Sequence, residues 1–163
     1  MNKQSKLIWG FVFFLVVFIE TGVAGNEKKI VPPPYIPGLG EIMNNNVQPH
    51  HIKLSLSGQF NNWPLALYEL DELREAFNAV KQYQGIWNDK KIAEMLPAFT
   101  DTHFTVIEKA IKEKDTKKFK NAYAQLTKAC NACHQANDRS FIVIKIPDSS
   151  PFSNQKFEPI KTN

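Results

Sequence analysis

Hydrophobic residues recur every three or four positions through most of the chain, the spacing that places them on one face of an α-helix. Four such stretches follow one another: the first covers residues 41–60, and the others begin near Asn61, Asn88 and Asp115. Alternation typical of strands is almost absent before Phe141. The pattern therefore predicts an all-α chain whose four amphipathic helices form an up-and-down antiparallel four-helix bundle.

Prolines and capping residues predict where these helices begin and bend. Asn61-Asn62-Trp63-Pro64 is typical of a helix start, because Asn caps an N-terminus and Pro is tolerated in the first turn. Pro49 predicts a kink or a restart in the first helix, and Pro97 predicts an early bend in the third. The fourth helix is expected to open at Asp115 or Thr116.

Proline-rich segments flank the predicted helical domain, residues 41–140. Residues 26–40 include Pro32-Pro33-Pro34 and predict an extended N-terminal leader, because proline fixes φ and lacks an N–H. Residues 141–163 also contain several prolines and predict an irregular C-terminal tail on the bundle, with a short extended piece at residues 141–144.

The N-terminus has the order of a secretory signal. Lys3 and Lys6 precede 13 uncharged residues, 7–19, and small residues follow at 21–25. A helix of that length spans roughly 20 Å, short of a hydrocarbon core of roughly 30 Å. We expect residues 1–25 to be a cleaved signal peptide, leaving a periplasmic protein with no stable membrane span. The alternative is an uncleaved N-terminal membrane anchor.

Composition limits the remaining possibilities. The chain has 163 residues, 43% hydrophobic and 22% charged, which suits one globular domain. A surplus of 20 basic over 16 acidic residues gives a net charge of +4, too small and too scattered to predict binding to nucleic acid. The two cysteines exclude a disulfide-dense scaffold and an all-cysteine zinc site.

The candidate chemistry is Cys130-Asn131-Ala132-Cys133-His134, the C-x-x-C-H pattern of covalent haem attachment. On a helix, positions i, i+3 and i+4 share a face, so both sulfurs can reach one edge of a porphyrin while the imidazole faces the iron. The motif predicts one covalent haem c, held by Cys130 and Cys133, with His134 as the proximal iron ligand.

Three other interpretations compete with haem. Cys130 and Cys133 could be a thiol–disulfide pair, although such pairs normally open a helix that follows a strand. They could bind zinc with His134 and a distant histidine, although His134 directly after Cys133 does not resemble structural zinc spacing. The pattern could also arise by chance.

At these residues the chain resembles the class II c-type cytochromes, meaning cytochrome c′ and its low-spin relatives. Lys128-Ala129-Cys130-Asn131-Ala132-Cys133-His134 is very similar to their final-helix signature, and residues 62–73 resemble small exported bacterial cytochromes c. The resemblance covers roughly residues 41–140. Two features depart from it: 29 residues follow His134, and Arg139 lies five positions past that histidine rather than four. An arginine four residues past this histidine is usual in the family. Because Arg139 lies one position further, the resemblance does not assign it a contact with a haem propionate.

The sixth iron ligand decides the kind of cytochrome. In an antiparallel bundle the first helix can cover the distal face of the haem, and it offers Met43, His50 and His51. The low-spin relatives use a Met there, whereas cytochrome c′ uses an apolar residue. We favour His51 as the distal ligand, because it matches a His-x-Lys-Leu pattern in the similar proteins; the others, or no ligand, remain open.

The expected function is one-electron transfer by a periplasmic monohaem c-type cytochrome between redox partner proteins. An enzyme is not expected, because the sequence shows no substrate pocket and no acid–base pair. The alternative is a gas-binding haem protein of the cytochrome c′ type, which would leave the distal site open to NO or CO. Many bundles of this kind pair through their first two helices, so a homodimer stays open.

Overall fold

The computed structural model describes residues 32–161, so the predicted signal peptide lies outside the described residues. Contacts divide the chain into Met1–Pro34 and Tyr35–Asn163, and the helices belong to the second unit. Its elements are α1 (Leu39–Ile42), the π-helix η1 (Met43–Val47), α2 (Gln48–Gln59), α3 (Trp63–Tyr83), α4 (Ile92–Lys112) and α5 (Thr116–Ala136). Residues 32–161 contain no strand, only an isolated bridge between Trp87 and Lys90. The all-α prediction is confirmed for this part of the chain.

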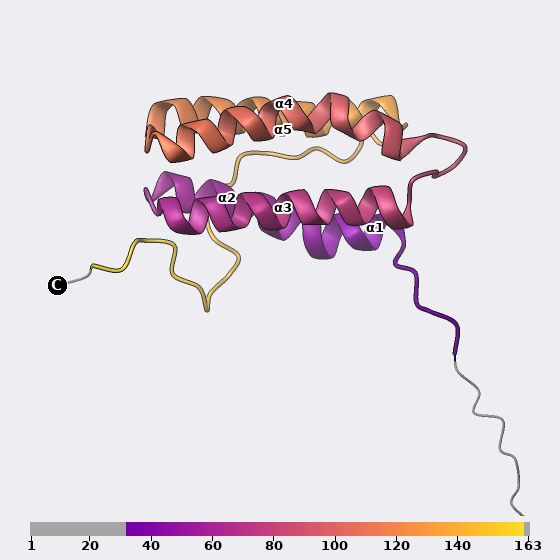
Figure 1. Cartoon of the computed structure of the whole chain (residues 1–163), viewed down its shortest axis with the longest axis horizontal. Coiled ribbons are helices and arrows are strands. Elements are labelled where there is room, and N and C mark those ends of the chain that lie inside the picture. The colour runs from indigo at the N-terminus through magenta and orange to yellow at the C-terminus, as the bar shows by residue number, and fades with distance from the viewer. Residues whose placement is uncertain (1–31, 162–163) are drawn as a thin grey trace, which may run out of the picture. The chain divides into compact units, whose positions relative to one another are not determined.

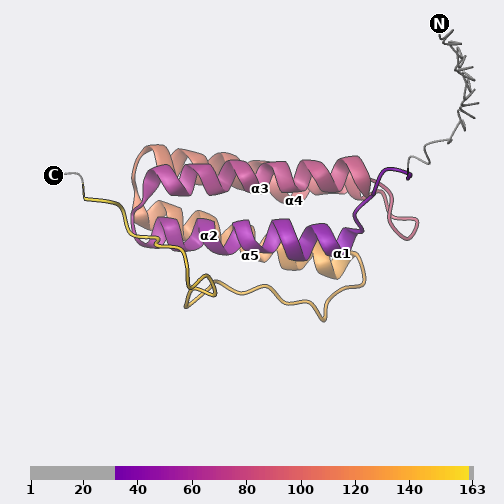
Figure 2. The same cartoon turned by 90° about the horizontal axis from the view of Figure 1, so that it is seen from below.

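The long helices lie side by side in two layers, α2 with α3 and α4 with α5 (Figure 1). Contacts also join α3 to α4 and α2 to α5, so each of these helices has two helical neighbours (Figure 2). Consecutive helices run in opposite directions, as short connections between neighbours require (Figure 1). No helix within residues 32–161 combines the length and the hydropathy needed to cross a membrane.

The first helical region changes from π-helix to α-helix just before Pro49. Pro49 has no N–H to donate, and its ring would collide with the carbonyl four residues earlier in a regular helix. The wider π-helix η1 precedes it, and α2 begins at Gln48 with the proline in its first turn. The backbone at Val47 and Gln48 keeps helical φ and ψ, so the helix continues into α2 without the predicted restart. The helical region begins at Leu39, slightly before the predicted boundary of the domain.

Side-chain caps fix the starts of α3 and α5. Asn62 Oδ1 accepts from the Leu65 N–H at 3.4 Å, and Asp115 Oδ1 accepts from the Lys118 N–H at 2.9 Å. Each bond satisfies one of the N–H groups that a helix start leaves without a partner. Both predicted starts are confirmed. Pro97 lies inside α4, as the sequence predicts.

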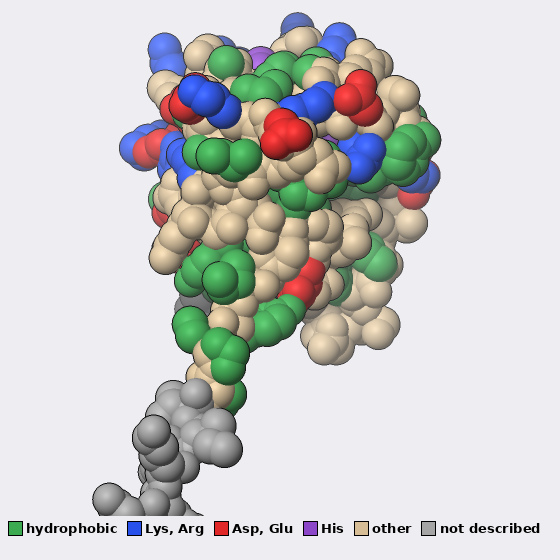
Figure 3. Space-filling model, turned by 90° about the vertical axis from the view of Figure 1, so that its right-hand side faces the viewer, with side chains coloured by type: hydrophobic (Ala, Val, Ile, Leu, Met, Phe, Trp, Pro, Cys, Tyr) green, Lys and Arg blue, Asp and Glu red, His purple; other side chains and the backbone are tan. Residues whose placement is uncertain are grey.

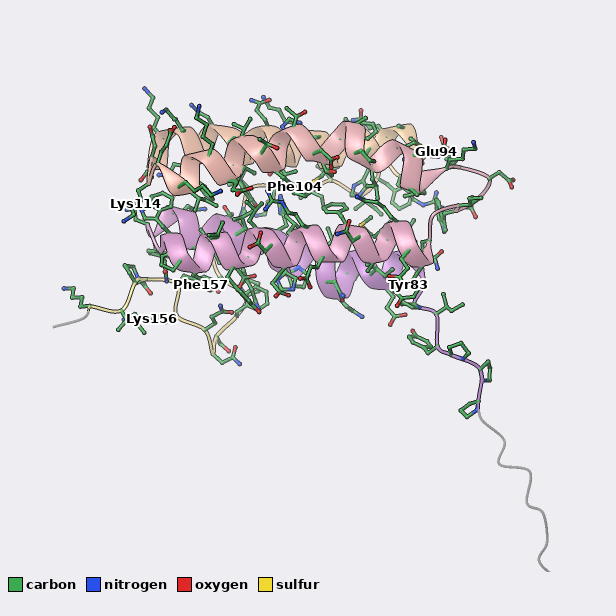
Figure 4. The ribbon with its side chains drawn as sticks, in the orientation of Figure 1. Tyr83, Glu94, Phe104, Lys114, Lys156 and Phe157 are labelled. Atoms are coloured by element: carbon green, nitrogen blue, oxygen red, sulfur yellow. The ribbon has the colours of Figure 1, made fainter. Side chains whose placement is uncertain are left out.

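One hydrophobic core runs between the layers. Phe104 of α4 points into the space between α3 and the neighbouring helices (Figure 4), and its ring lies 5.7 Å from that of Phe77. Fully buried leucine and isoleucine side chains come from all four long helices: Leu54, Leu70, Leu73, Leu96, Ile107 and Leu126. Their packing fixes the positions of the four helices that line the candidate site.

The C-terminal tail runs back along α5 and α2 as irregular chain (Figure 2). Gln59 of α2 donates to the Pro147 carbonyl, and Asn62 donates to the Phe157 carbonyl at 3.1 Å. Phe157 is itself buried against the helices (Figure 4). Residues 141–144 form no strand. The tail is thus attached to the helices at several separate points.

Candidate functional site

An apolar cavity of about 220 Å³ lies where η1, α2, α3, α4 and α5 converge near the C-terminal end of α5. All of these elements and the tail contribute to its wall, so the site depends on the whole arrangement of helices. The apolar residues that line it are Leu39, Met43, Val47, Leu73, Phe77, Trp87, Ile92, Leu96, Phe99, Leu126, Ile142 and Ile144.

The residues of the C-x-x-C-H motif line this cavity together. Cys130, Cys133 and His134 come from the last turns of α5, where their spacing puts them on one face of the helix. His51 and Met43 line the same cavity from the first helical region. Seen from the end that carries the α3–α4 connection, the surface mixes hydrophobic side chains with basic and acidic ones (Figure 3).

The two cysteines are free, half-buried thiols. Burial, together with the smaller effect of the neighbouring Cys133, raises the pKa of Cys130 to about 12. Burial also raises the pKa of Cys133, against a hydrogen bond from Asn137 that lowers it. A C-terminal helix turn adds no stabilisation for a thiolate, because the helix dipole is negative at that end. These thiols are therefore neutral, unlike the acidic thiols of disulfide oxidoreductases.

His134 is oriented by the tail. Its Nδ1 lies 3.0 Å from the carbonyl oxygen of Ile142. A carbonyl only accepts, so the proton must be on Nδ1 and the Nε2 lone pair is free. Metal-binding histidines commonly donate their second ring N–H to such a carbonyl. His134 thus presents the tautomer that a proximal iron ligand requires.

His51 is buried between α2 and α5, with both ring nitrogens engaged. Thr127 Oγ1 donates to the Tyr123 carbonyl at 3.1 Å, so it must accept from His51 Nε2–H at 3.2 Å. The Tyr123 hydroxyl lies 2.8 Å from His51 Nδ1 and 2.9 Å from the His51 carbonyl. Burial lowers the pKa of His51 to about 4, so the ring is neutral at pH 7.

His50 does not line the cavity. Its Nδ1 lies 2.8 Å from Oε2 of the buried Glu69, and its Nε2 lies 3.9 Å from Glu72. Both carboxylates belong to α3, so the ring faces that helix. Of the three distal candidates in the sequence, the structure brings Met43 and His51 to the cavity and leaves His50 outside its wall.

Other residues of the site carry no sequence signal of their own. Asn137 donates from Nδ2 to the Cys133 carbonyl at 2.8 Å, while its Oδ1 is the one buried side-chain oxygen in residues 32–161 without a partner. The guanidinium of Arg139 lies 4.6 Å from the centre of the Trp87 ring, at the cavity wall. Neither Asn137 nor Trp87 belongs to a motif, so only the folded chain identifies them.

Cys130, Cys133 and His134 suit a covalently attached haem better than a zinc ion. Within residues 32–161 no three or more His, Cys, Asp or Glu side chains are placed to hold one metal ion, whereas structural zinc needs four such ligands. Haem attachment needs only two thiols and one imidazole on a common face, beside an apolar space. The cavity offers that set, and Asn137, whose Nδ2 lies 3.6 Å from Cys133 Sγ and whose Oδ1 has no partner, is part of its wall.

Comparisons with protein-family models, with curated proteins and with solved structures find no match to this chain.

Proposed function

We propose that the chain is a periplasmic monohaem c-type cytochrome that carries one electron at a time between redox partner proteins. One haem c is bonded through Cys130 and Cys133, and His134 is its proximal iron ligand. The observation that carries this proposal is the convergence of the three residues on one apolar cavity, with His134 Nε2 left free by the bond from Nδ1 to Ile142.

The finer architecture belongs to the same proposal. The helices form an antiparallel four-helix bundle of the class II cytochrome kind, with an extended leader that ends before α1 and an irregular tail at residues 141–163. Packing of α2 with α3, α4 with α5 and α5 with α2 supports it. The secretory pattern of residues 1–25 supports export, which covalent haem attachment in bacteria requires.

When bound, the haem supplies an iron that can change its charge by one unit. The residues of this chain set the reduction potential of that change. Apolar side chains from several helices line the cavity, and an apolar surrounding is one of the features that set the reduction potential of a haem. Nδ1–H of His134 stays hydrogen-bonded to a backbone carbonyl. This bond fixes the ring and makes Nε2 a more basic, stronger iron ligand.

His51 is proposed as the distal ligand. Its proton would move from Nε2 to Nδ1, where the Tyr123 oxygen, 2.8 Å away, accepts it. The Tyr123 hydroxyl proton would then turn from His51 Nδ1 to the His51 carbonyl oxygen, which lies 2.9 Å away. Thr127 would lose its bond to Nε2. Burial keeps the imidazole neutral, as an iron ligand must be.

A gas-binding protein of the cytochrome c′ type is the second candidate. The observation that favours it is the pair of bonds that tie His51 to Tyr123 and Thr127 on α5. If these bonds persist in the haem protein, His51 cannot act as the distal ligand. The distal face would then meet the apolar Val47 and the weak ligand Met43, and NO or CO would find an open position.

The absorption spectrum of the reduced protein, with and without CO, tests both candidates. The protein is produced in a periplasm that attaches haem c, with a Cys130→Ala, Cys133→Ala double variant as the matched control. A sharp low-spin α band that CO leaves unchanged supports the electron carrier. A Soret band shifted by CO supports the gas binder. Absence of any visible band in the wild type, as in the control, contradicts both.

A further inference from the structure

The first part of the tail is held against α5 by a pair of side-chain hydrogen bonds. Asn131, the first variable residue of the C-x-x-C-H motif, donates from Nδ2 to the Ile144 carbonyl at 2.9 Å. The Ile144 N–H donates back to Asn131 Oδ1 at 2.7 Å. One amide side chain thus satisfies both backbone groups of Ile144, as a neighbouring strand would. The tail follows α5 over this stretch (Figure 2).

The same stretch of tail reaches His134. Residues two apart in extended chain point their groups in the same direction, so the carbonyls of Ile142 and Ile144 both face α5. The Ile142 N–H is also fixed, because it donates to the Arg139 carbonyl at 2.9 Å. The carbonyl that accepts from His134 Nδ1 is therefore held from both sides, by the turn at Arg139 and by Asn131.

We propose that residues 141–147 are a positioning strap for His134 and that Asn131 fastens it. The Ile142 carbonyl sets the tautomer and the rotation of the imidazole, and the Asn131 amide keeps this carbonyl in place. The inference rests on the proposed function, because it assigns the tail a role toward the proximal ligand. The strap also covers the cavity, since Ile142 and Ile144 are part of its wall.

The strap has a measurable consequence for the iron. A hydrogen bond from Nδ1 makes Nε2 more basic, which favours the oxidised iron and lowers the reduction potential. Loss of the bond should raise the potential and let the Nδ1 proton exchange with solvent. A tail that merely stabilises the fold would change the free energy of unfolding without moving either quantity.

The C-terminal end of the tail, residues 149–163, offers the matched control. It is attached to α2 and α3 by the buried Phe157, by Asn62 and by Lys53, whose Nζ lies 4.9 Å from the centre of the Phe152 ring. Removal of residues 149–163 breaks these contacts and leaves Ile142, Ile144 and Asn131 in place. It therefore lowers stability without touching His134.

The test compares the reduction potential and the exchange of the His134 Nδ1 proton in four haem-loaded proteins. These are the wild type, Asn131→Ala, a chain ending at Ser140 and a chain ending at Asp148. Alanine is a better helix former than asparagine, so the substitution does not weaken α5. We expect a higher potential and faster proton exchange in Asn131→Ala and in the chain ending at Ser140, and wild-type values in the chain ending at Asp148.

Intact mass separates the possible failures. Asn131→Ala can carry haem and still show the wild-type potential and a protected Nδ1 proton. That result overturns the strap and leaves the proposed function standing. Wild-type protein without haem overturns both. If Asn131→Ala does not fold, the reduction potential and the Nδ1 proton exchange of the chain ending at Ser140 are compared with those of the chain ending at Asp148. Equal values in these two chains overturn the strap.

Discussion

Two histidines that are adjacent in the sequence have different surroundings. His51 is buried against Tyr123 and Thr127, whereas His50 is paired with Glu69 and Glu72 of α3. Only His51 lines the cavity that holds the C-x-x-C-H residues. This contrast gives any experiment on the distal ligand an internal control one residue away.

The first prediction concerns the spin state. His51→Ala should convert a low-spin spectrum of the haem protein into a high-spin one, because the strong second axial ligand is lost. His50→Ala should leave the spectrum low-spin, since its ring faces the carboxylates of α3. Absorption and electron paramagnetic resonance spectra report the change. An unaltered spectrum in His51→Ala would move the distal position to Met43 or leave it empty.

The second prediction concerns the pH dependence of stability in the haem-free chain. Burial lowers the pKa of His51 from 6.5 to about 4, so the unfolded chain takes up this proton at a higher pH than the folded one. Stability should therefore fall as the pH drops from 6.5 to 4, by about 3 kcal/mol through this residue. Above pH 6.5 this contribution does not change.

Urea unfolding at several pH values checks this prediction against His51→Gln, which keeps hydrogen-bonding groups without a titrating ring. The wild type should lose more stability than the variant between pH 6.5 and pH 4. Parallel curves for the two proteins would show that the ring is exposed or already charged in the folded chain.

At the scale of elements, α2 and α5 are in close contact at Gly58. A Cβ atom built there would lie 2.0 Å from Cε1 of Phe119, far inside contact distance. Phe119 cannot easily move, because its ring is buried and lies 6.2 Å from Tyr123 and 6.0 Å from Trp63. Gly58 is thus required by the packing of two helices and not by backbone conformation.

The third prediction concerns this helix packing. Gly58→Ala should lower the free energy of unfolding by about 1–3 kcal/mol, the usual cost of overfilling a core, despite the better helix propensity of alanine. Gly38→Ala is the control, since nothing lies within 4 Å of its added methyl group. Equal stability of both variants in urea unfolding would mean that α2 and α5 lie further apart in solution.

The starts of α3 and α5 could be predicted from the sequence because local chemistry sets them. Asn62 and Asp115 cap these two helices with their own side chains. The buried face of the first helix could not be predicted. The π-helix η1 uses more residues per turn than an α-helix, so a spacing of three and four residues does not mark one face across it, and it is His51, not His50, that is buried.

The site was only partly predictable for a similar reason. Cys130, Cys133 and His134 form a local motif, so the sequence alone brings them to one face of a helix. The contacts of Asn131 and His134 with the tail join residues through irregular chain that has no periodicity. Asn137 and the ring of Trp87 likewise become part of the site only through packing.

At the scale of the molecule, the surface near the site exposes several apolar side chains. Ile86, Phe141 and Val143 are exposed apolar side chains on the α3–α4 connection and the start of the tail. Basic and acidic side chains lie among hydrophobic ones on part of this end of the molecule (Figure 3). The net charge of +4 is small, so long-range attraction of a partner by the whole molecule is weak.

The most direct test of the central claim is the intact mass of the exported protein, produced in cells that attach haem c. The account predicts a chain without residues 1–25 that is heavier than its polypeptide by roughly 616 Da, the mass of one haem. The increment should survive denaturation and disappear in the Cys130→Ala, Cys133→Ala double variant. A mature wild-type chain with the bare polypeptide mass would contradict the assignment of Cys130, Cys133 and His134, and with it the proposed electron transfer.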